Sequence, residues 1–465
     1  MLEGLSVKIS IIKFSETFSN SDFRIDAEYY DPFSIDVHNK ILQKNGVNFF
    51  SKIQKISSGK NLPQVDSGKF SFVRTQNVRP VLIDDSGMSF VDDLGSLKPT
   101  KKGDLLFVRV GEGVGNSSVV TQKYSGQAFS DNVLRLEIKD LNPFFCSVFF
   151  NSRVGQLYFK RVFKGTARSL ISQENFKEIL IPIFGDHFQS LIQKLVEDAQ
   201  NFLEESQGIY TQAEALLLKS LGLENFSPSN KNTGIKSFKD SFTATSRLDA
   251  EYYQPKYEDY QNHIFSYSEG WLPLGKVCDL KDKNYSPSDE KFYQYIELAD
   301  IDKSGGVKGC SKELGKDLPS RARRKVNAED VLISSIEGSL SSCAIVCKEF
   351  GDSLCSTGFY VIKSDKISSE TLLVLFKSDL MQNILKQSCS GTILTAINKD
   401  EFLKIPLPLI DQKNQSQISS LVQESFTLKS KSEKLLEVAK QAIEMAIEES
   451  EEAAIKFINH NNLSR

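Results

Sequence analysis

The sequence predicts an α+β protein with two β-rich domains separated by an antiparallel pair of long helices that form a coiled coil. The first observation behind this fold class is that a series of short motifs occurs twice, in the same order, along the 465 residues. The second is that each series ends in a long stretch poor in glycine and proline, with apolar residues three and four positions apart, as in an amphipathic helix. The duplication implies a pseudo-twofold internal repeat.

The clearest copy of the repeat is a nine-residue segment near the start of each half. Residues 24–32 (RIDAEYYDP) and 247–255 (RLDAEYYQP) share seven of nine residues at an offset of 223. Shorter matches follow in the same order at an offset of 226: GDLLF at 103–107 with EDVLI at 329–333, Gly165-Thr166 with Gly391-Thr392, Phe176 with Phe402, and IPI at 181–183 with LPL at 407–409. Several matches in order at a nearly constant offset are not expected by chance, so the chain is a duplicated module.

Each module has the pattern of short strands joined by turns. Apolar and β-branched runs alternate with Gly, Ser, Asn and Asp, and in the first module these runs are 70–73, 104–110, 118–120 and 133–138. A short capped helix at 172–176 (SQENF) is expected before the IPI exit. Residues 227–234 (SPSNKNTG) predict a linker between the modules. We therefore expect a first domain at 1–185, a helix at 186–222, a linker at 223–243, a second domain at 244–411, a helix at 412–458 and a tail at 459–465.

Heptad spacing predicts that the two long helices pack on each other. In the first helix an apolar series recurs every seven residues: Val196, Leu203, Tyr210 and Leu217. The second helix has Val422, Lys429, Leu436 and Ile443, with Leu428 and Leu435 alongside. Both also carry a series of small residues: Ala199, Ser206, Ala213 and Ser220, and Ser425, Ser432, Ala439 and Ala446. The alternative is two amphipathic helices, each packed on its own module. Because the modules repeat, paired helices would be antiparallel, and the C-terminus would return to the first module.

Composition is that of an ordinary globular protein, with 40% hydrophobic and 25% charged residues. We find no apolar run of 18 residues and no secretory signal, so we expect no membrane span. The seven cysteines are an odd number, which favours reduced thiols and a cytoplasmic location. The net charge of −3 is concentrated on the helices, which carry −4 (186–222) and −2 (412–458) and leave +3 elsewhere. This distribution permits DNA binding without requiring it.

Two copies of Arg-(Ile/Leu)-Asp-Ala-Glu-Tyr-Tyr each open a β-rich module, which closes with Gly-Thr, Phe and an (Ile/Leu)-Pro-(Ile/Leu) exit before a long helix. Over nearly the whole chain this arrangement resembles the specificity (S) subunit of type I restriction-modification systems. The resemblance implies two target-recognition domains, each reading one half of a split site in double-stranded DNA, with the helices setting the distance between halves. It also implies that two methyltransferase (modification) subunits bind this chain and that restriction subunits can join the complex. Those partners bind S-adenosylmethionine and methylate adenine, so the chain itself would be non-catalytic and need no cofactor.

Two other functions remain open at this point. The chain could be the specificity component of another defence system that uses the same modules. It could also be a coiled-coil scaffold whose β-modules bind protein or carbohydrate. Electrophoretic mobility shift of DNA, with and without a modification subunit, distinguishes these possibilities.

Methyltransferase activity in the chain itself is poorly supported. Residues 142–145 (NPFF) approach the Asn-Pro-Pro-Tyr/Phe signature with which amino-methyltransferases hold a flipped base, but the second Pro is absent. Residues 111–115 (GEGVG) could pass for a glycine-rich cofactor loop, yet the second module has only one glycine at the equivalent place, 337–340 (EGSL). A tight turn between strands explains both copies. Asp26 and Glu28 occur in the repeated segment of both modules, so we interpret them as structural.

Neither a metal site nor a catalytic triad is expected. Cys343, Cys347 and Cys355 are loosely spaced with no histidine near them, and the first module has other residues at these places, so buried free thiols are the simplest interpretation. The four histidines are widely scattered: His38, His187, His263 and His460.

Basic and amide residues in the module loops are the candidates for DNA contact. Arg and Lys read guanine edges, Asn and Gln read adenine edges, and any of them can hold phosphates. In the first module the candidates are Arg74, Gln76, Asn77, Arg79, Arg109 and Arg168, with Lys98, Lys101 and Lys102 for phosphate. In the second they are Arg321, Arg323, Arg324 and Lys325, with Tyr293 and Gln294 as weaker candidates. The alternative for each is a solvated surface charge, and the cluster at 321–325 is the best supported because basic residues occur near the same place in both modules.

Overall fold

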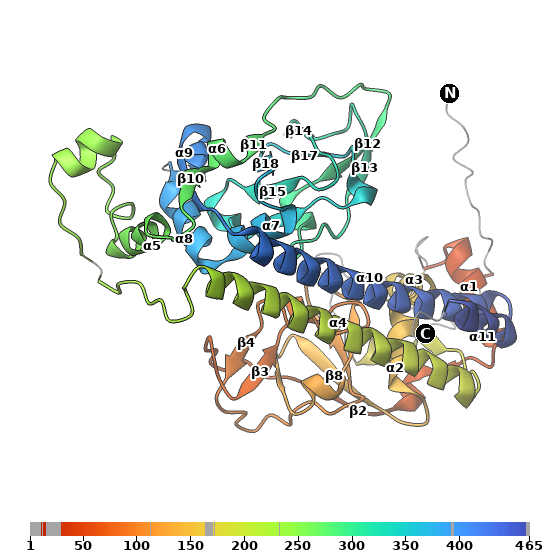
Figure 1. The fold of residues 1–465 in the computed structure, drawn as a ribbon. Coiled ribbons are helices and arrows are strands. Elements are labelled where there is room, and N and C mark those ends of the chain that lie inside the picture. The colour runs from red at the N-terminus through yellow and green to blue at the C-terminus, as the bar shows by residue number, and fades with distance from the viewer. Residues whose placement is uncertain are drawn as a thin grey trace. The chain divides into compact units, whose positions relative to one another are not determined.

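The computed structural model describes residues 11, 13–14, 29–111, 113–162, 171, 173–231, 233–391 and 395–461 (Figure 1). Two compact units are present. Unit 1 consists of Met1–Glu204 with Lys429–Arg465, and unit 2 consists of Glu205–Leu428. The long helices α4 (Asp186–Ser220) and α10 (Gln412–Glu448) each contribute to both units. No helix among the described residues is long and apolar enough to cross a membrane.

Unit 1 contains two main sheets. The larger is antiparallel, in the order β2 (Ile53–Ser58), β8 (Val133–Ile138), β5 (Leu105–Val108) and β6 (Ser117–Val119). The smaller has the order β4 (Ser89–Val91), β3 (Phe70–Val73) and β7 (Ala128–Phe129), with β3 and β7 parallel. A short ladder pairs β1 (Val47–Asn48) with β9 (Leu180–Ile181). Because β5 and β8 are central strands with almost every side chain buried, they read as continuous apolar runs in the sequence.

Four helices of unit 1 share one core with the larger sheet, and this core is rich in aromatic residues. They are α1 (Pro32–Gln43), α2 (Pro143–Asn151), α3 (Arg153–Val162) and α11 (Glu451–His460). Residues 144–151 of α2 are all buried, as expected for a helix that is apolar on every side. Phe150 packs edge-to-face on Phe107 of β5 and on Phe49, with ring centroids 5.2 and 4.7 Å apart.

Unit 2 repeats this architecture. Its first sheet has the order β11 (Asp279–Leu280), β18 (Phe359–Lys363), β15 (Val331–Ser334) and β16 (Cys343–Ile345). Its second has the order β13 (Ser311–Leu314), β12 (Phe292–Ile296), β17 (Leu354–Ser356) and β14 (Ala322–Lys325), with β12 and β17 parallel. A ladder pairs β10 (Trp271–Pro273) with β21 (Pro406–Pro408). Apart from the added β14, this is the strand order found in unit 1, so the predicted internal repeat is a repeat of fold as well as of sequence.

Helices of unit 2 follow the same correspondence, and the differences are local. They are α5 (Pro255–Phe265), α6 (Leu274–Val277), α7 (Ser369–Lys377), α8 (Asp379–Ser388) and α9 (Lys399–Lys404). Strand β14 has no counterpart among the described strands of unit 1. Neither has the pair β19 (Cys389–Ser390) and β20 (Ala396–Ile397).

The predicted pairing of the two long helices is confirmed within each unit. In unit 1, Val196 and Ala199 of α4 share a core with Leu435 and Ala439 of α10. In unit 2, Ala213 and Leu217 of α4 share a core with Ile418 and Val422 of α10. Residue numbers rise along one helix as they fall along the other, so the pair is antiparallel; Figure 1 shows the two helices alongside each other. Each long helix also packs on residues of the modules. The alternative of two amphipathic helices that pack on modules is therefore correct for part of the buried surface of each helix.

The C-terminal end of the chain lies in unit 1. Helix α10 ends at Glu448, and Ser450 caps a separate helix, α11, by accepting a hydrogen bond from the Ala453 N–H. Arg153 of α3 forms an ion pair with Glu448 at 2.9 Å, and Lys44 donates to the carbonyl of Glu449 at 2.7 Å. This agrees with the expected return of the chain to the first module. The predicted domain boundaries stay a prediction.

The repeated RLDAEYY segment has a structural role in the second copy. Arg247 forms a two-pronged ion pair with Asp249 (2.8 and 2.6 Å) and donates to the carbonyl of Cys389 at 2.9 Å. Its guanidinium also lies 4.2 Å from the ring centroid of Tyr252. Through Arg247, the segment therefore holds the start of the module against the end of α8. Several residues singled out in the sequence lie outside the described part of the chain: residues 24–28, Glu112, Gly165, Thr166, Arg168, Ser172 and Thr392.

Candidate nucleic-acid interface

The first candidate loop of unit 1 is built around a buried asparagine. Asn77 is fully buried; its side-chain oxygen accepts the Arg74 N–H at 3.0 Å and its amide donates to the carbonyl of Asp84 at 2.9 Å. Both ends of the amide are therefore used to hold loop 74–87 closed. In this conformation Asn77 supports the loop and does not face solvent.

The other candidates of this loop reach its surface. Arg74 and Gln76 both donate to the carbonyl of Gly87, at 3.0 and 3.3 Å. Arg79 is exposed, with Asp84 4.0 Å from its Nε. Exposed contacts of this kind contribute little to stability, so a phosphate or a base edge can replace them. The structure thus brings Arg74, Gln76 and Arg79 together on one loop.

The three lysines of residues 98–102 occupy a turn before β5 and differ in availability. Lys98 and Lys101 are exposed, and the carbonyl of Lys98 accepts a hydrogen bond from Arg135 at 3.1 Å. Lys102 instead forms an ion pair with Glu197 of α4 at 3.0 Å. Lys98 and Lys101 are therefore open to a phosphate, whereas Lys102 is directed at a helix acid.

Arg109 follows directly after β5 and is half-buried. Its N–H donates to the carbonyl of Asn132 at 2.9 Å, and its carbonyl accepts from Ile171 at 3.0 Å. The Nε atom is buried and has no hydrogen-bond partner among the residues that the structure describes. Arg168, the remaining candidate of this module, lies outside the described residues.

In the basic cluster of unit 2, Arg323, Arg324 and Lys325 lie on strand β14 and not on a loop, and Arg321 directly precedes this strand. Strand β14 is the last strand of its sheet and pairs with β17, and its other side has an isolated bridge between Arg324 and Asn284. A register shift between Ala322 and Arg324 marks a bulge, which leaves Arg323 as the extra residue. Basic side chains at a sheet edge are a common way to prevent edge-to-edge pairing, and they also form a positive rim.

The partners of this cluster are weak or neutral. Arg324 donates to the side chain of Asn284 at 3.0 Å, and Lys325 forms an ion pair at 3.3 Å with Asp352, which is itself 80% exposed. The pKa of nearby Asp282 is lowered, chiefly by its hydrogen bond to Lys399 and further by the charge of Arg324. The basic cluster therefore keeps most of its positive charge available to a polyanion.

The two weaker candidates of unit 2 lie on β12, in the same sheet. Tyr293 is buried; its hydroxyl accepts the Ser288 N–H at 3.0 Å and lies 3.3 Å from the hydroxyl of Tyr285. Gln294 is half-buried and accepts a hydrogen bond from Ser353 at 3.3 Å. In this conformation Tyr293 is a packing residue, whereas Gln294 shares a sheet with the basic cluster.

Sequence reasoning missed an exposed aromatic residue beside these candidates. Phe292 is 57% exposed on β12, and the Lys312 Nζ of β13 lies 5.9 Å from its ring centroid. Lys291 lies 5.5 Å from the ring centroid of Tyr293. An exposed ring beside a cation can stack on or wedge against a base. The Lys-Phe-Tyr-Gln run at 291–294 was the available signal, because a surface strand has no packing need for a solvent-exposed Phe.

Rival chemical sites have structural explanations. Asn142 of the NPFF segment is the N-cap of α2, where its side chain accepts from Phe144 at 2.9 Å, and Pro143 occupies the first helical position. All seven cysteines are free, and Cys146, Cys343 and Cys355 are buried, which raises their pKa values. Among the described residues, no cluster of three or more His, Cys, Asp or Glu is suited to a metal ion.

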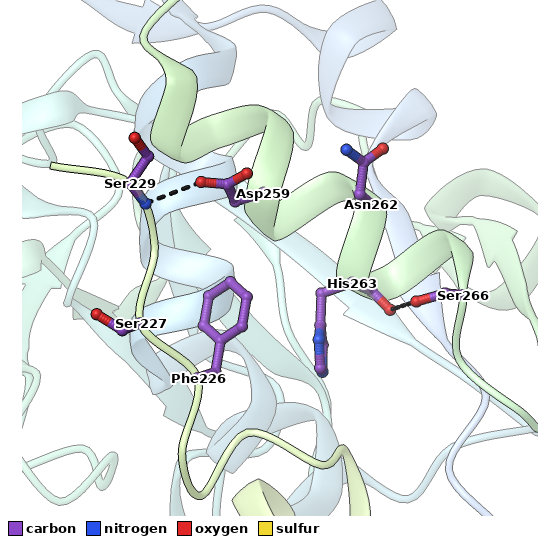
Figure 2. A pocket seen from close by; sticks show the side chains of 7 residues that line it. All are labelled: Phe226, Ser227, Ser229, Asp259, Asn262, His263 and Ser266. Carbon is purple, nitrogen blue, oxygen red and sulfur yellow. Dashed lines mark hydrogen bonds between the residues drawn. The ribbon is translucent and has the colours of Figure 1, made fainter. Parts of the chain in front are cut away.

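A surface hollow in unit 2 lacks the charge of a phosphate site. Figure 2 shows its lining residues: Phe226, Ser227, Ser229, Asp259, Asn262, His263 and Ser266. Asp259 accepts the Ser229 N–H at 2.8 Å, and His263 is hydrogen-bonded to the carbonyl of Leu221 at 2.7 Å. No Arg or Lys lines it, so the loop of unit 1 and the sheet edge of unit 2 remain the candidate interface.

Comparison with known proteins shows which family the second module resembles. Residues 270–439 match a family model described as the type I restriction modification DNA specificity domain. No curated protein sequence matches the chain significantly. Among solved structures, the S subunit of a type I restriction-modification system from M. genitalium aligns at 13% identity over 89% of this chain and 95% of that chain, with a TM-score of 0.38. A structure described by complex assembly and conformational transition of the type I system aligns at 14% identity over 90% of this chain and 96% of that chain, with a TM-score of 0.28. The HsdS subunit from Thermoanaerobacter tengcongensis aligns at 14% identity over 87% of this chain and 96% of that chain, with a TM-score of 0.27.

These TM-scores are low, so the likeness to a DNA specificity domain depends on the family model alone. The matched range contains β10 to β21 and most of α10, which is the repeated module with its long helix. The resemblance expected from the sequence is confirmed. Residues 270–439 are therefore similar to the DNA specificity domain of type I restriction-modification systems.

Proposed function

We propose that this chain is the DNA-recognising specificity subunit of a type I restriction-modification complex and binds a bipartite site in double-stranded DNA. One observation carries the proposal: the module whose second copy matches a DNA specificity domain is present twice, and each copy runs into one of two antiparallel helices. Two different modules on one chain suit two different half-sites. The helices between them suit an unread gap.

The chain acts without chemistry of its own. Its partners are two methyltransferase subunits, which supply S-adenosylmethionine binding and methyl transfer, and restriction subunits. The residues that resembled a methyltransferase signature serve instead as a helix cap, at Asn142 and Pro143. All seven cysteines are free thiols, which suits action in the cytoplasm, where DNA and its modifying enzymes meet.

Each module offers DNA a different set of side chains. In the first, Arg74, Gln76 and Arg79 would read or hold DNA from one loop, with Lys98 and Lys101 on phosphates. In the second, Arg321, Arg323, Arg324 and Lys325 would line the DNA from the edge of a sheet, beside Gln294 and Phe292. Strand β14 has no described counterpart in unit 1, so the modules differ where contact is proposed. That difference supports recognition of two unlike half-sites.

Assembly with methyltransferase subunits tests the proposal. The complex should methylate adenine within one bipartite sequence in a genome-wide map of methylated sites, and gel shift should show a preference for that sequence. The chain alone should transfer no methyl groups and show no S-adenosylmethionine binding by calorimetric titration. A micromolar S-adenosylmethionine site on the isolated chain would contradict the non-catalytic role. Binding to protein or carbohydrate with no DNA preference, with or without the methyltransferase, would favour the scaffold alternative.

A further inference from the structure

Three serine hydroxyls are buried between α4 and α10, at two places along the helix pair. In unit 2, Ser206 donates to the carbonyl of Ser425, and Ser425 donates to the carbonyl of Ser206, both at 2.9 Å. In unit 1, Ser432 donates to the carbonyl of Ala199 at 2.7 Å. The three serines are 3%, 1% and 2% exposed, respectively. We call the first contact the reciprocal clasp and the second the single clasp.

The two clasps are equivalent positions of the repeat. An offset of 226 converts Ser206 into Ser432 and Ala199 into Ser425. The single clasp is therefore the reciprocal clasp with one hydroxyl missing, because Ala199 stands where a second serine would stand. The boundary between the two units, at 204/205 and at 428/429, falls between the clasps on both helices.

Packing alone does not require these hydroxyls. Ala213 and Ala439 occupy the same small-residue series and are fully buried with only a methyl group. Serines in helices commonly satisfy their hydroxyl on their own helix, four residues back, as exposed Thr211 does. Ser206, Ser425 and Ser432 instead use a carbonyl of the opposite helix. Apolar contact is non-directional, whereas a hydrogen bond holds its atoms within a few tenths of an ångström.

That difference matters for a chain that measures distance along DNA. Consecutive base pairs are about 3.4 Å apart, so telling one gap length from the next needs module separation fixed to better than that spacing. A helix pair held only by small apolar side chains can shift along its axis at little cost. Because the clasp bonds run across the helix axes, moving one helix by about 2.5 Å along its axis, less than the base-pair spacing, would stretch all three beyond hydrogen-bond range and leave buried hydroxyls without partners.

We propose that the two clasps fix the axial position of α4 on α10 and so determine how strictly the chain distinguishes DNA gaps that differ by one base pair. This inference rests on the proposed function as a bipartite DNA reader. Ser206, Ser425 and Ser432 are positioning residues. They lie between the helices and act through the distance between the modules.

The test compares methylation rates of the assembled complex on sites with the correct half-sites and a gap that is native, one base pair shorter or one base pair longer. Ser206→Ala with Ser425→Ala should lower the preference for the native gap by about fivefold for each hydrogen bond removed. Ala199→Ser, which rebuilds the second reciprocal clasp, should raise the preference by a similar factor. The matched control, Ser420→Ala with Ser430→Ala on the exposed surface of α10, should change neither.

The outcomes separate this inference from the function on which it rests. A wild-type complex that methylates no bipartite site would refute the proposed function. A wild-type complex with one preferred gap, and a Ser206→Ala/Ser425→Ala variant with the same preference, would refute the clasps alone. The clasps are also refuted if the double variant loses activity equally on all three gaps, because that pattern reports only stability.

Discussion

At the scale of single residues, one buried aspartate in each module shows what the repeat preserves. Asp104 and Asp330 both accept a backbone N–H from three residues earlier, at 2.7 and 2.8 Å, and so close the turn before a central strand. The cation beside each differs: Arg135 of β8, 3.7 Å away, serves Asp104, and Lys281, 2.7 Å away, serves Asp330. The repeat therefore predicts the acid from sequence. It does not predict the cation, because the two modules supply it from different places: Arg135 lies on β8, whereas Lys281 directly follows β11.

This arrangement predicts that Arg135→Met destabilises unit 1 by about 3–5 kcal/mol, because it leaves the charge of Asp104 buried beside Glu137 without its cation. Hydrogen exchange should speed up in β5 and β8 while β15 and β18 stay protected. The double variant Arg135→Met/Asp104→Asn should lose less, since the buried charge is gone. Equal loss of protection in both units would contradict this account.

A histidine between α1 and α3 gives unit 1 a pH dependence. Burial, with the charge of Arg161 as the second cause, lowers the pKa of His38 to about 4. The unfolded chain binds a proton there near pH 6.5 and the native state does not, so stability should fall as the pH drops from about 6.5 towards 4. We expect a loss of about 1–2 kcal/mol, because solvent screens a half-buried ring.

Urea unfolding at pH 7 and pH 4.5 measures this loss. His38→Gln keeps a polar group beside Tyr158, to which His38 is hydrogen-bonded, but cannot titrate. The variant should therefore be less sensitive to pH than the wild type. His187→Gln, at an exposed position of α4, is the matched control. A wild-type slope unchanged by His38→Gln would show that another group is responsible.

At the scale of elements, sequence periodicity predicted the buried strands and long helices better than the exposed elements. Central strands and helix seams have a strict apolar pattern because they are buried on defined faces. Strand β14 (ARRK) has one buried residue, Ala322, among four positions, so it carries no such pattern and was expected as a loop. Its strand conformation depends on pairing with β17, a contact that local sequence does not encode.

The basic edge strand leads to a prediction about DNA affinity. Replacing Arg321, Arg323, Arg324 and Lys325 with Ala should weaken binding of the assembled complex by a similar factor on every sequence, if these side chains hold phosphates. The slope of log affinity against log salt should shrink by roughly one unit per lost contact. The control replaces four lysines outside this sheet: Lys256, Lys276, Lys366 and Lys386. Unchanged affinity at every salt concentration would show that the cluster only protects the sheet edge.

At the scale of the whole molecule, the duplication was the most informative feature of the sequence. It predicted two modules, two helices, their antiparallel pairing and the return of the C-terminus. The two loops and one sheet edge that are proposed to contact DNA were harder to predict. Modules that read two unlike half-sites must differ at their DNA-binding surfaces, so the repeat does not identify those residues. Asn77 illustrates the difficulty: an asparagine in a polar loop suits adenine recognition, yet it is buried and braces the loop.

The length of the helices predicts the effect of shortening them together. Helix α4 has 35 residues and is about 52 Å long, more than one turn of DNA at roughly 34–36 Å. Removing 199–205 from α4 and the facing residues 426–432 from α10 keeps the heptad phase and the reciprocal clasp of Ser206 with Ser425. One heptad is about 10.5 Å of helix, so the gap should shorten by about three base pairs.

Both half-sites should stay unchanged, because the modules that read them are untouched. Mapping methylated sites for the wild-type complex and the shortened variant gives gap and half-sites in one measurement. Removing the seven residues from α4 alone is the control; it shortens one helix and not the other, so the native contacts of α4 with α10 cannot be kept in both units, and methylation should be abolished. Altered half-sites at a constant gap in the paired deletion would mean that the helices do not set the spacing.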